Sequence, residues 1–162
     1  MKSVCYNLAR LVPFFILVLL MGSTVSAKRN YPPEIQGARV EVYKSVDGVN
    51  LRLWIFAPDG HTSEESVPAI IFFFGGGWNS GSPEQFIAQA NYLQDRGMVA
   101  VLADYRVKFR NKVQARYCVE DAKSALRWVR QNADRLGIDP DRIVAAGGSA
   151  GGHLAASTAT LP

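Results

Sequence analysis

A serine flanked by glycines is the residue of this sequence best placed to do covalent chemistry. Residues 147–152 read Gly-Gly-Ser-Ala-Gly-Gly, so Gly147, Ser149 and Gly151 match the pattern G-x-S-x-G. The largely apolar residues 142–146, which read Arg-Ile-Val-Ala-Ala, precede this motif, and a segment with helical character follows it. Glycines on both sides allow a strand and a helix to approach closely at a sharp turn that exposes the serine hydroxyl. The pattern therefore predicts a nucleophilic serine.

A glycine-rich turn between a strand and a helix can instead bind phosphate. A P-loop needs a lysine directly before its serine or threonine, and residue 148 is glycine. A dinucleotide-binding fingerprint needs the spacing G-x-G-x-x-G after the first strand of its unit, and the spacing here differs. We therefore expect no nucleotide cofactor, and neither a metal nor any other cofactor is predicted.

A second glycine cluster has the composition of a site that stabilises negative charge. Gly75, Gly76, Gly77 and Trp78 directly follow the apolar residues 68–74. Attack of a serine on an ester carbonyl places negative charge on the carbonyl oxygen, which fixed main-chain N–H groups stabilise. The presence of both motifs favours this oxyanion-binding interpretation over a merely flexible loop. For Trp78, a role in lining a substrate pocket and a simple packing role both stay open.

The remaining residues predict a sheet that positions the two motifs. Alternating apolar residues around Asp47-Gly48 predict an antiparallel hairpin. Continuous apolar runs typical of buried parallel strands then alternate with helical patterns. The expected strands are residues 68–74, 98–103 and 142–146, and the expected helices are 83–96, 114–136 and 150–160, with a turn at 137–140. This order is typical of an α/β domain, here residues 38–162 after a polar lead-in, residues 28–37.

The first 27 residues have the features of a signal peptide. Lys2 and Arg10 flank the start of this segment, residues 11–21 are apolar, and Val25-Ser26-Ala27 offers small residues for cleavage. The mature protein is therefore expected to be secreted or periplasmic, with no stable membrane span. An uncleaved signal anchor that tethers it to a membrane is the alternative. After cleavage Cys118 is the only cysteine, so no internal disulfide is expected and the thiol is interpreted as structural.

The overall composition is that of one globular domain without a nucleic-acid partner. Lys and Arg number 18 and Asp and Glu 14 among 162 residues, for a net charge of +4. The basic residues are scattered and are not interleaved with aromatic residues along a stripe. The length suits a single domain with a sizeable core.

Taken together, the motifs resemble the esterase/lipase branch of the α/β-hydrolases that is related to hormone-sensitive lipase, especially its acetyl-esterase-like and carboxylesterase-like members. The resemblance is carried by the Gly-Gly-Gly-Trp loop, by Asp104-Tyr105-Arg106, by the long helix and by Gly-Gly-Ser-Ala-Gly-Gly-His-Leu-Ala. It implies the N-terminal part of an α/β-hydrolase fold, a hairpin followed by parallel strands with crossover helices, whose C-terminal strands are missing. It also implies that the amides of Gly76, Gly77 and Ala150 form the oxyanion hole.

Three residues beside these motifs are interpreted as structural. The family usually has a histidine where this chain has Phe74, and this difference is expected to alter the anchoring of the loop more than its chemistry. Asp104 and Asp121 are expected to serve in hydrogen bonds and ion pairs.

The resemblance also indicates where a general base should lie. A serine nucleophile needs a histidine to take its proton and a carboxylate to orient that histidine, and in this fold both follow the serine. Only 13 residues follow Ser149, and none of them is acidic. His61, in a polar loop, and His153, on the helix after the motif, are both interpreted as structural. The acid and base are therefore expected outside this sequence, so the chain is interpreted as a fragment, a truncated gene product or a short natural product that is inactive alone.

The favoured hypothesis is a secreted serine hydrolase that cleaves carboxylic esters through an acyl-enzyme on Ser149. Its partner would be a small-molecule or carbohydrate-linked ester. Two alternatives stay open. One is an exopeptidase of the same superfamily, and the other is a non-catalytic, hydrolase-like remnant or binding domain.

Overall fold

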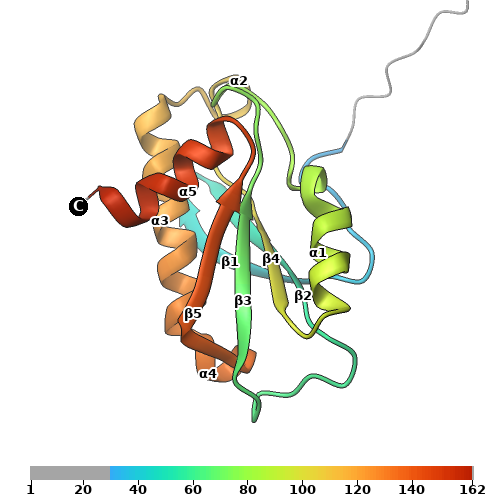
Figure 1. The fold of residues 1–162 in the computed structure, drawn as a ribbon. Helices are drawn as coiled ribbons and strands as arrows, with labels where there is room; N and C mark the ends of the chain where they lie inside the picture. The colour runs from blue at the N-terminus through green and yellow to red at the C-terminus, as the bar shows by residue number, and fades with distance from the viewer. Residues whose placement is uncertain (1–29, 162) are drawn as a thin grey trace, which may run out of the picture.

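The chain folds as one five-stranded sheet covered by helices (Figure 1). The computed structural model describes residues 30–161, so the predicted signal peptide, residues 1–27, lies outside the described residues. The strands are β1 (Arg39–Val46), β2 (Val49–Phe56), β3 (Val67–Phe73), β4 (Val99–Ala103) and β5 (Ile138–Gly147). Their order across the sheet is β1-β2-β4-β3-β5. Between residues 30 and 161, no helix is both long and apolar enough to cross a membrane.

The first two strands form the hairpin that the Asp47-Gly48 turn predicts. Both turn residues have positive φ angles, 51° and 73°, as a two-residue turn between twisted strands requires. The antiparallel register pairs Val46 with Val49. The hairpin joins the rest of the sheet through β2, which runs antiparallel to β4.

The last three strands run parallel, and this arrangement brings their carboxyl ends to one edge. β3 lies between β4 and β5, and its last residue, Phe73, is level with Ala103 on one side and Gly147 on the other. The segments that follow these three residues therefore start side by side. They are the glycine loop, the Asp104-Tyr105-Arg106 segment and the serine motif.

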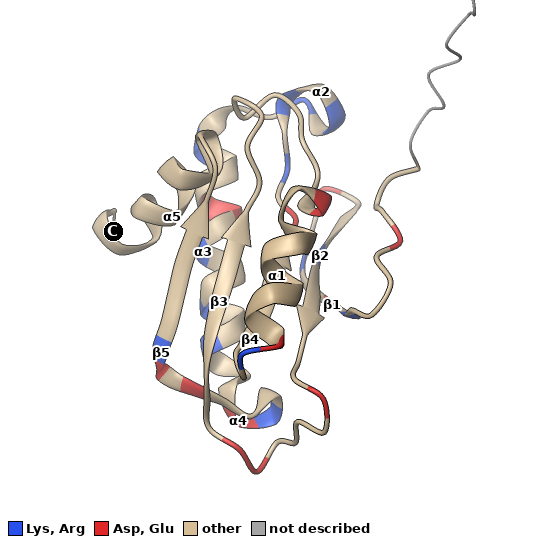
Figure 2. Cartoon of the chain, turned by 45° about the vertical axis from the view of Figure 1, so that its right-hand side comes forward, with Lys and Arg blue, Asp and Glu red and all other residues tan. Residues whose placement is uncertain are grey.

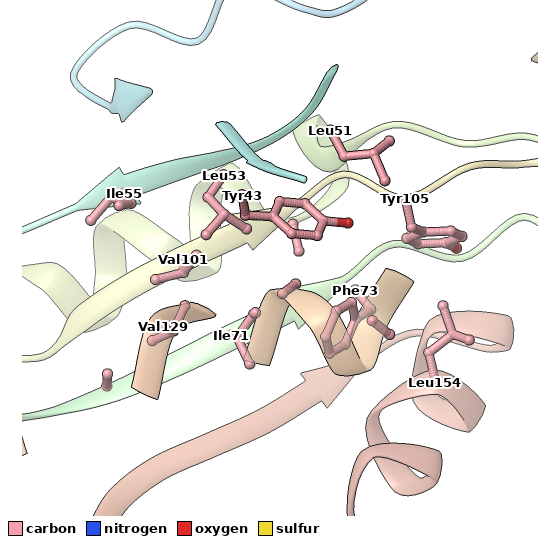
Figure 3. Close-up of a cluster of buried hydrophobic side chains, with 14 of the residues drawn as sticks. Tyr43, Leu51, Leu53, Ile55, Ile71, Phe73, Val101, Tyr105, Val129 and Leu154 are labelled. Atoms are coloured by element: carbon pink, nitrogen blue, oxygen red, sulfur yellow. The ribbon is translucent and has the colours of Figure 1, made fainter. Parts of the chain in front are cut away.

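Helices cover both faces of the sheet. They are α1 (Ile87–Gln94), α2 (Lys108–Asn111), α3 (Ala115–Gln131), α4 (Ala133–Leu136) and α5 (Ala150–Thr160). Figure 1 shows α1 on one face and α3 and α5 on the other. Because side chains alternate along a strand, Leu53 contributes to the core beneath α3 while Trp54 contributes to the core beneath α1. Figure 3 shows part of the larger core, which includes Leu53, Ile71, Phe73, Val101, Val129 and Leu154.

Two of the three helices predicted from the sequence are interrupted. The expected helix 83–96 is a 3₁₀ turn, Pro83–Phe86, followed by α1, although Ser82 caps it as its residue type suggests. The expected helix 114–136 is divided at Asn132 into α3 and α4, because Asn132 leaves helical geometry and its side-chain amide donates to the carbonyl of Trp128.

The prediction for the third parallel strand was wrong in two respects. Only Gly137, with φ 63°, behaves as the predicted helix stop, and residues 138–140 already belong to β5. In addition, β5 is not buried on both faces, since it forms the edge of the sheet in this chain and Val144 is 51% exposed.

A buried ion-pair network stabilises the segment after β4. Asp121, on α3, is fully buried and accepts hydrogen bonds from the main-chain N–H, Nε and Nη2 of Arg106 at 3.1, 2.8 and 2.9 Å. Lys44 of β1 donates to the same carboxylate from 2.6 Å. The thiol of Cys118 lies nearby and donates to the carbonyl of Arg106, and burial raises its pKa to about 11. The structural interpretations of Asp121 and Cys118 are therefore confirmed.

Candidate active site

Ser149 occupies the turn between β5 and α5 in a strained conformation. Its φ and ψ angles are 52° and −117°, and the residue is exposed to solvent. A residue with a Cβ atom pays about 1–3 kcal/mol for such a conformation, which surrounding contacts must offset. The turn is held by a hydrogen bond from the amide of Gly151 to the carbonyl of Gly148 at 2.8 Å. The serine therefore projects at the first turn of α5, where the helix dipole favours negative charge.

The glycines around Ser149 are required by close packing. A Cβ atom on Gly151 would lie 1.9 Å from the carbonyl oxygen of Phe73 at the end of β3. A Cβ atom on Gly147 would lie 2.4 Å from the backbone of Gly151. The G-x-S-x-G spacing thus allows the strand and helix to approach as the sequence predicts.

The glycine loop lies against this turn. A Cβ atom on Gly75 would come within 2.8 Å of the carbonyl oxygen of Gly148, and it would lie 3.5 Å from the Cβ atom of Ser149. Gly76 and Gly77 have φ angles of 142° and 61°, which favour glycine. Within residues 30–161, the amides of Gly76, Gly77 and Ala150 donate no hydrogen bond. Three free donors thus belong to the two segments that meet beside the nucleophile.

Aromatic stacking anchors the start of the loop at the position where the family has histidine. The ring of Phe74 stacks on that of Tyr105, with centroids 4.0 Å apart and planes inclined by 12°. The Tyr105 hydroxyl also donates to the carbonyl oxygen of Phe74 at 2.5 Å. Tyr105 follows β4, so the predicted Asp-Tyr-Arg segment supports the glycine loop directly.

Gln85 contacts the glycine loop, although no sequence pattern singled it out. Its side-chain amide makes two hydrogen bonds with Gly75: Oε1 accepts from the N–H at 2.8 Å, and Nε2 donates to the carbonyl at 3.0 Å. Both main-chain groups of the buried Gly75 are thereby satisfied by one side chain ten residues further along. This contact fixes the loop immediately before Gly76.

If the chain is an esterase as its motifs predict, replacing Gln85 with alanine is expected to lower kcat for ester hydrolysis about 10- to 100-fold with little change in KM, because the amides of Gly76 and Gly77, which are predicted to stabilise the oxyanion, would lose their alignment. Steady-state kinetics and the rate of fluorophosphonate labelling would measure the effect. Gln89→Ala, which removes an exposed glutamine one turn further on, serves as the matched control. Equal losses in both variants, or a change confined to KM, would contradict this role for Gln85.

Neither histidine of the chain is placed to act as a base. His61 hydrogen-bonds to Glu65 and to the carbonyl of Leu136, near the start of β5 and away from the serine. The ring of His153 packs edge-on against Trp78, with centroids 5.4 Å apart. No hydrogen bond to the Ser149 hydroxyl occurs within residues 30–161. Both histidines thus have the structural surroundings that the sequence suggests.

Trp78 has the packing role that was one of the two interpretations of this residue, and the role in lining a substrate pocket stays a prediction. Its ring packs against the larger core, and the residue also lines a groove beside the glycine loop. Its indole N–H is buried without a hydrogen-bond partner among residues 30–161. Nor do these residues include a group of three or more His, Cys, Asp or Glu side chains that could hold a metal ion.

A buried carboxylate connects the start of the described chain to the far end of the glycine loop. Asp104 is 2% exposed and accepts hydrogen bonds from the Tyr31 hydroxyl and the main-chain N–H of Tyr105. Arg110 lies over the Tyr31 ring, contacts Asp104 at 3.3 Å and donates to the carbonyl of Gly81 at 3.0 Å. The structural interpretation of Asp104 is therefore confirmed.

Burial raises the pKa of Asp104 from 3.8 to about 6, despite the opposing hydrogen bond from Tyr31. Between these values the folded protein binds a proton that the unfolded chain does not, so the contribution of Asp104 to stability increases as the pH falls from 7 towards 4. The slope is at most about 1.4 kcal/mol per pH unit. We expect the wild type to gain stability relative to Asp104→Asn over this range in urea-unfolding experiments. A constant difference between the two proteins, or a decreasing one, would contradict the assignment.

Comparison with known proteins decides the family. The family model BD-FAE matches residues 53–162, which include the glycine loop and the serine turn. This chain belongs to the BD-FAE family. The motifs of this chain predicted a resemblance to esterases of the α/β-hydrolase class, and the comparisons confirm it.

Relatives of this chain include several esterases. Carboxylesterase NlhH of Mycobacterium tuberculosis is 37% identical over 99 residues, which cover 60% of this chain and 30% of the relative. An arylesterase of Saccharolobus solfataricus is 33% identical over 131 residues, or 80% of this chain and 41% of the relative. The structure of the thermophilic esterase Est2 of Thermogutta terrifontis superposes with a TM-score of 0.81 at 58% identity, over 83% of this chain and 48% of that one. The same esterase has been solved phosphorylated by paraoxon. This chain thus spans about half the length of each of these relatives, or less.

Proposed function

We propose that this chain supplies the nucleophile and the oxyanion hole of a serine carboxylesterase. The observation that carries the proposal is the meeting of an exposed, strained Ser149 with a glycine loop whose amides are free. The esterase relatives support it, and the region that matches the family model, residues 53–162, includes both motifs.

In the proposed reaction, Ser149 Oγ attacks the carbonyl carbon of the ester and loses its proton to a base. The carbonyl electrons move to the oxygen, which accepts hydrogen bonds from Gly76, Gly77 and Ala150. Each such donor is worth roughly 3–4 kcal/mol in the transition state. Collapse of the intermediate breaks the ester bond, and the leaving oxygen takes the proton from the base, so that a neutral alcohol leaves. Water then attacks the acyl-serine, releasing the carboxylic acid and restoring the hydroxyl.

Turnover also requires a base for the Oγ proton and a carboxylate that orients it. Since neither His61 nor His153 contacts the serine hydroxyl, the proposal assigns these two roles to no residue between 30 and 161. We also propose that the protein is exported from the cytoplasm, because residues 1–27 have the features of a signal peptide.

Covalent labelling tests the assignment of the nucleophile. The complete product of the reading frame would be treated with a fluorophosphonate, and the labelled peptide would be identified by mass spectrometry. The structure of the Thermogutta esterase phosphorylated by paraoxon supports the choice of an organophosphorus reagent. We expect stoichiometric labelling of Ser149 in the complete product, together with hydrolysis of 4-nitrophenyl esters. Absence of both would overturn the proposal and favour the non-catalytic alternative.

A further inference from the structure

A groove of about 520 Å³ lies directly beside the proposed oxyanion hole. Gly77, Trp78 and Asn79 line one part of it, and residues 108–109 and 112–115 line the other. Main-chain hydrogen bonds join the two parts: Lys108 donates to the carbonyl of Trp78 at 3.0 Å, and the next residue, Phe109, donates to that of Asn79 at 2.9 Å. A substrate held at Gly77 therefore has this groove as its neighbour.

The chain around α2 is strongly basic. Residues 106–116 contain five basic residues and no Asp or Glu, and in Figure 2 much of the ribbon at α2 has the blue colour of Lys and Arg. Two of the five are neutralised by carboxylates, because Arg106 pairs with Asp121 and Asp47 and Arg110 pairs with Asp104.

Of the three basic residues that remain, Lys108 and Lys112 line the groove and Arg116 does not. Lys108 and Lys112 are exposed, and their ammonium groups have no acidic partner within residues 30–161. No acidic residue lines the groove. Between the two lysines, Phe109 is 66% exposed, which is unusual for a large aromatic side chain. The groove thus combines an apolar surface with two unpaired positive charges.

We infer that this groove binds the charged end of an anionic ester, such as one that carries a carboxylate; the inference rests on the proposed function. Phe109 would cover the carbon skeleton of the substrate, and Lys108 and Lys112 would pair with its negative charge. Exposed ion pairs of this kind change binding about two- to five-fold each, and they weaken as salt rises.

Matched pairs of esters test the inference with the complete product of the reading frame. Mono-4-nitrophenyl adipate and its methyl ester differ by one charge on the acyl side. The ester 4-acetoxybenzoate and its methyl ester differ by one charge on the alcohol side. For each pair the quantity measured is the ratio of kcat/KM for the anionic ester to kcat/KM for the neutral ester. The neutral member serves as an internal reference, because a structural defect lowers both rates together.

In at least one pair we expect Lys108→Gln and Lys112→Gln each to lower this ratio about two- to five-fold, and added salt to lower it in the wild type. The pair that responds shows whether the groove holds the acyl or the alcohol part. Arg127→Gln is the control. It removes one positive charge from an exposed position on α3, about 18 Å along the helix from Ala115 at the groove, and should leave the ratio unchanged.

Two outcomes separate this inference from the proposed function. If neutral esters are hydrolysed but both lysine variants keep the wild-type ratio in both pairs, the inference is wrong and the esterase assignment stands. If the wild type hydrolyses no ester and Ser149 is not labelled, the proposed function fails and the inference fails with it.

Discussion

Replacing Ser149 with alanine is expected to lower kcat/KM for ester hydrolysis by about 10⁵- to 10⁶-fold, because the covalent step loses its nucleophile. The residual rate would come from substrate binding and from the amides of Gly76, Gly77 and Ala150. Initial-rate kinetics with 4-nitrophenyl butyrate on the complete product of the reading frame would measure the loss. A decrease of less than tenfold would mean that another residue is the nucleophile.

The same position offers a stability measurement that does not depend on catalysis. Ser149→Gly should be as inactive as Ser149→Ala. Its free energy of unfolding should exceed that of Ser149→Ala by about 1 kcal/mol, because glycine adopts a φ angle of 52° without the cost that a Cβ atom imposes. Urea unfolding would compare the two variants. Ser124→Gly, within α3, is the control and should be destabilising, because glycine weakens a helix interior.

Replacing Asp121 with alanine is expected to lower the free energy of unfolding by about 3–5 kcal/mol. The carboxylate accepts four hydrogen bonds, three from Arg106 and one from Lys44. Its removal would leave Arg106, which is 3% exposed, without its principal buried partner. Chemical denaturation followed by circular dichroism would give the difference.

Asp139→Ala is the matched control for this substitution. Asp139 pairs with Arg142 at 2.6 Å in an exposed position, so its loss should leave the unfolding midpoint almost unchanged. Equal effects of Asp121→Ala and Asp139→Ala would show that the buried network contributes nothing beyond a surface pair.

The two glycine motifs could be predicted because their requirements are local. A strand, a sharp turn and a helix that begins at once need glycine at residues 147 and 151, and the close contacts with Phe73 and across the turn show why. The hairpin was equally predictable, since the Asp47-Gly48 turn and the alternation around it lie within one short segment. The sequence therefore located, by residue number, the turn and the loop to which we assign the nucleophile and the oxyanion hole.

The residues that support these motifs could not be predicted because their partners are distant. Gln85 forms hydrogen bonds with the main-chain groups of Gly75 only because the loop between them folds back on itself. No spacing of residue types in the sequence predicts that fold of the loop. The helix α2 has too few apolar residues for a periodic pattern, and it forms where the chain docks on the carbonyls of Trp78 and Asn79. The break at Asn132 likewise depends on one side-chain hydrogen bond.

If the chain is cleaved after its predicted signal peptide, the contacts of Tyr31 with Asp104 and Arg110 limit how far the new amino terminus can lie from these two residues. Cleavage after Ala27, as the sequence predicts, would leave residues 28–30 ahead of the ring that contacts Asp104 and Arg110. Three residues span at most about 11 Å when fully extended. A purification tag or fluorophore joined to the mature amino terminus would therefore sit beside the groove lined by Tyr31, Gly81 and Gln85, and labels meant to be silent should be attached elsewhere.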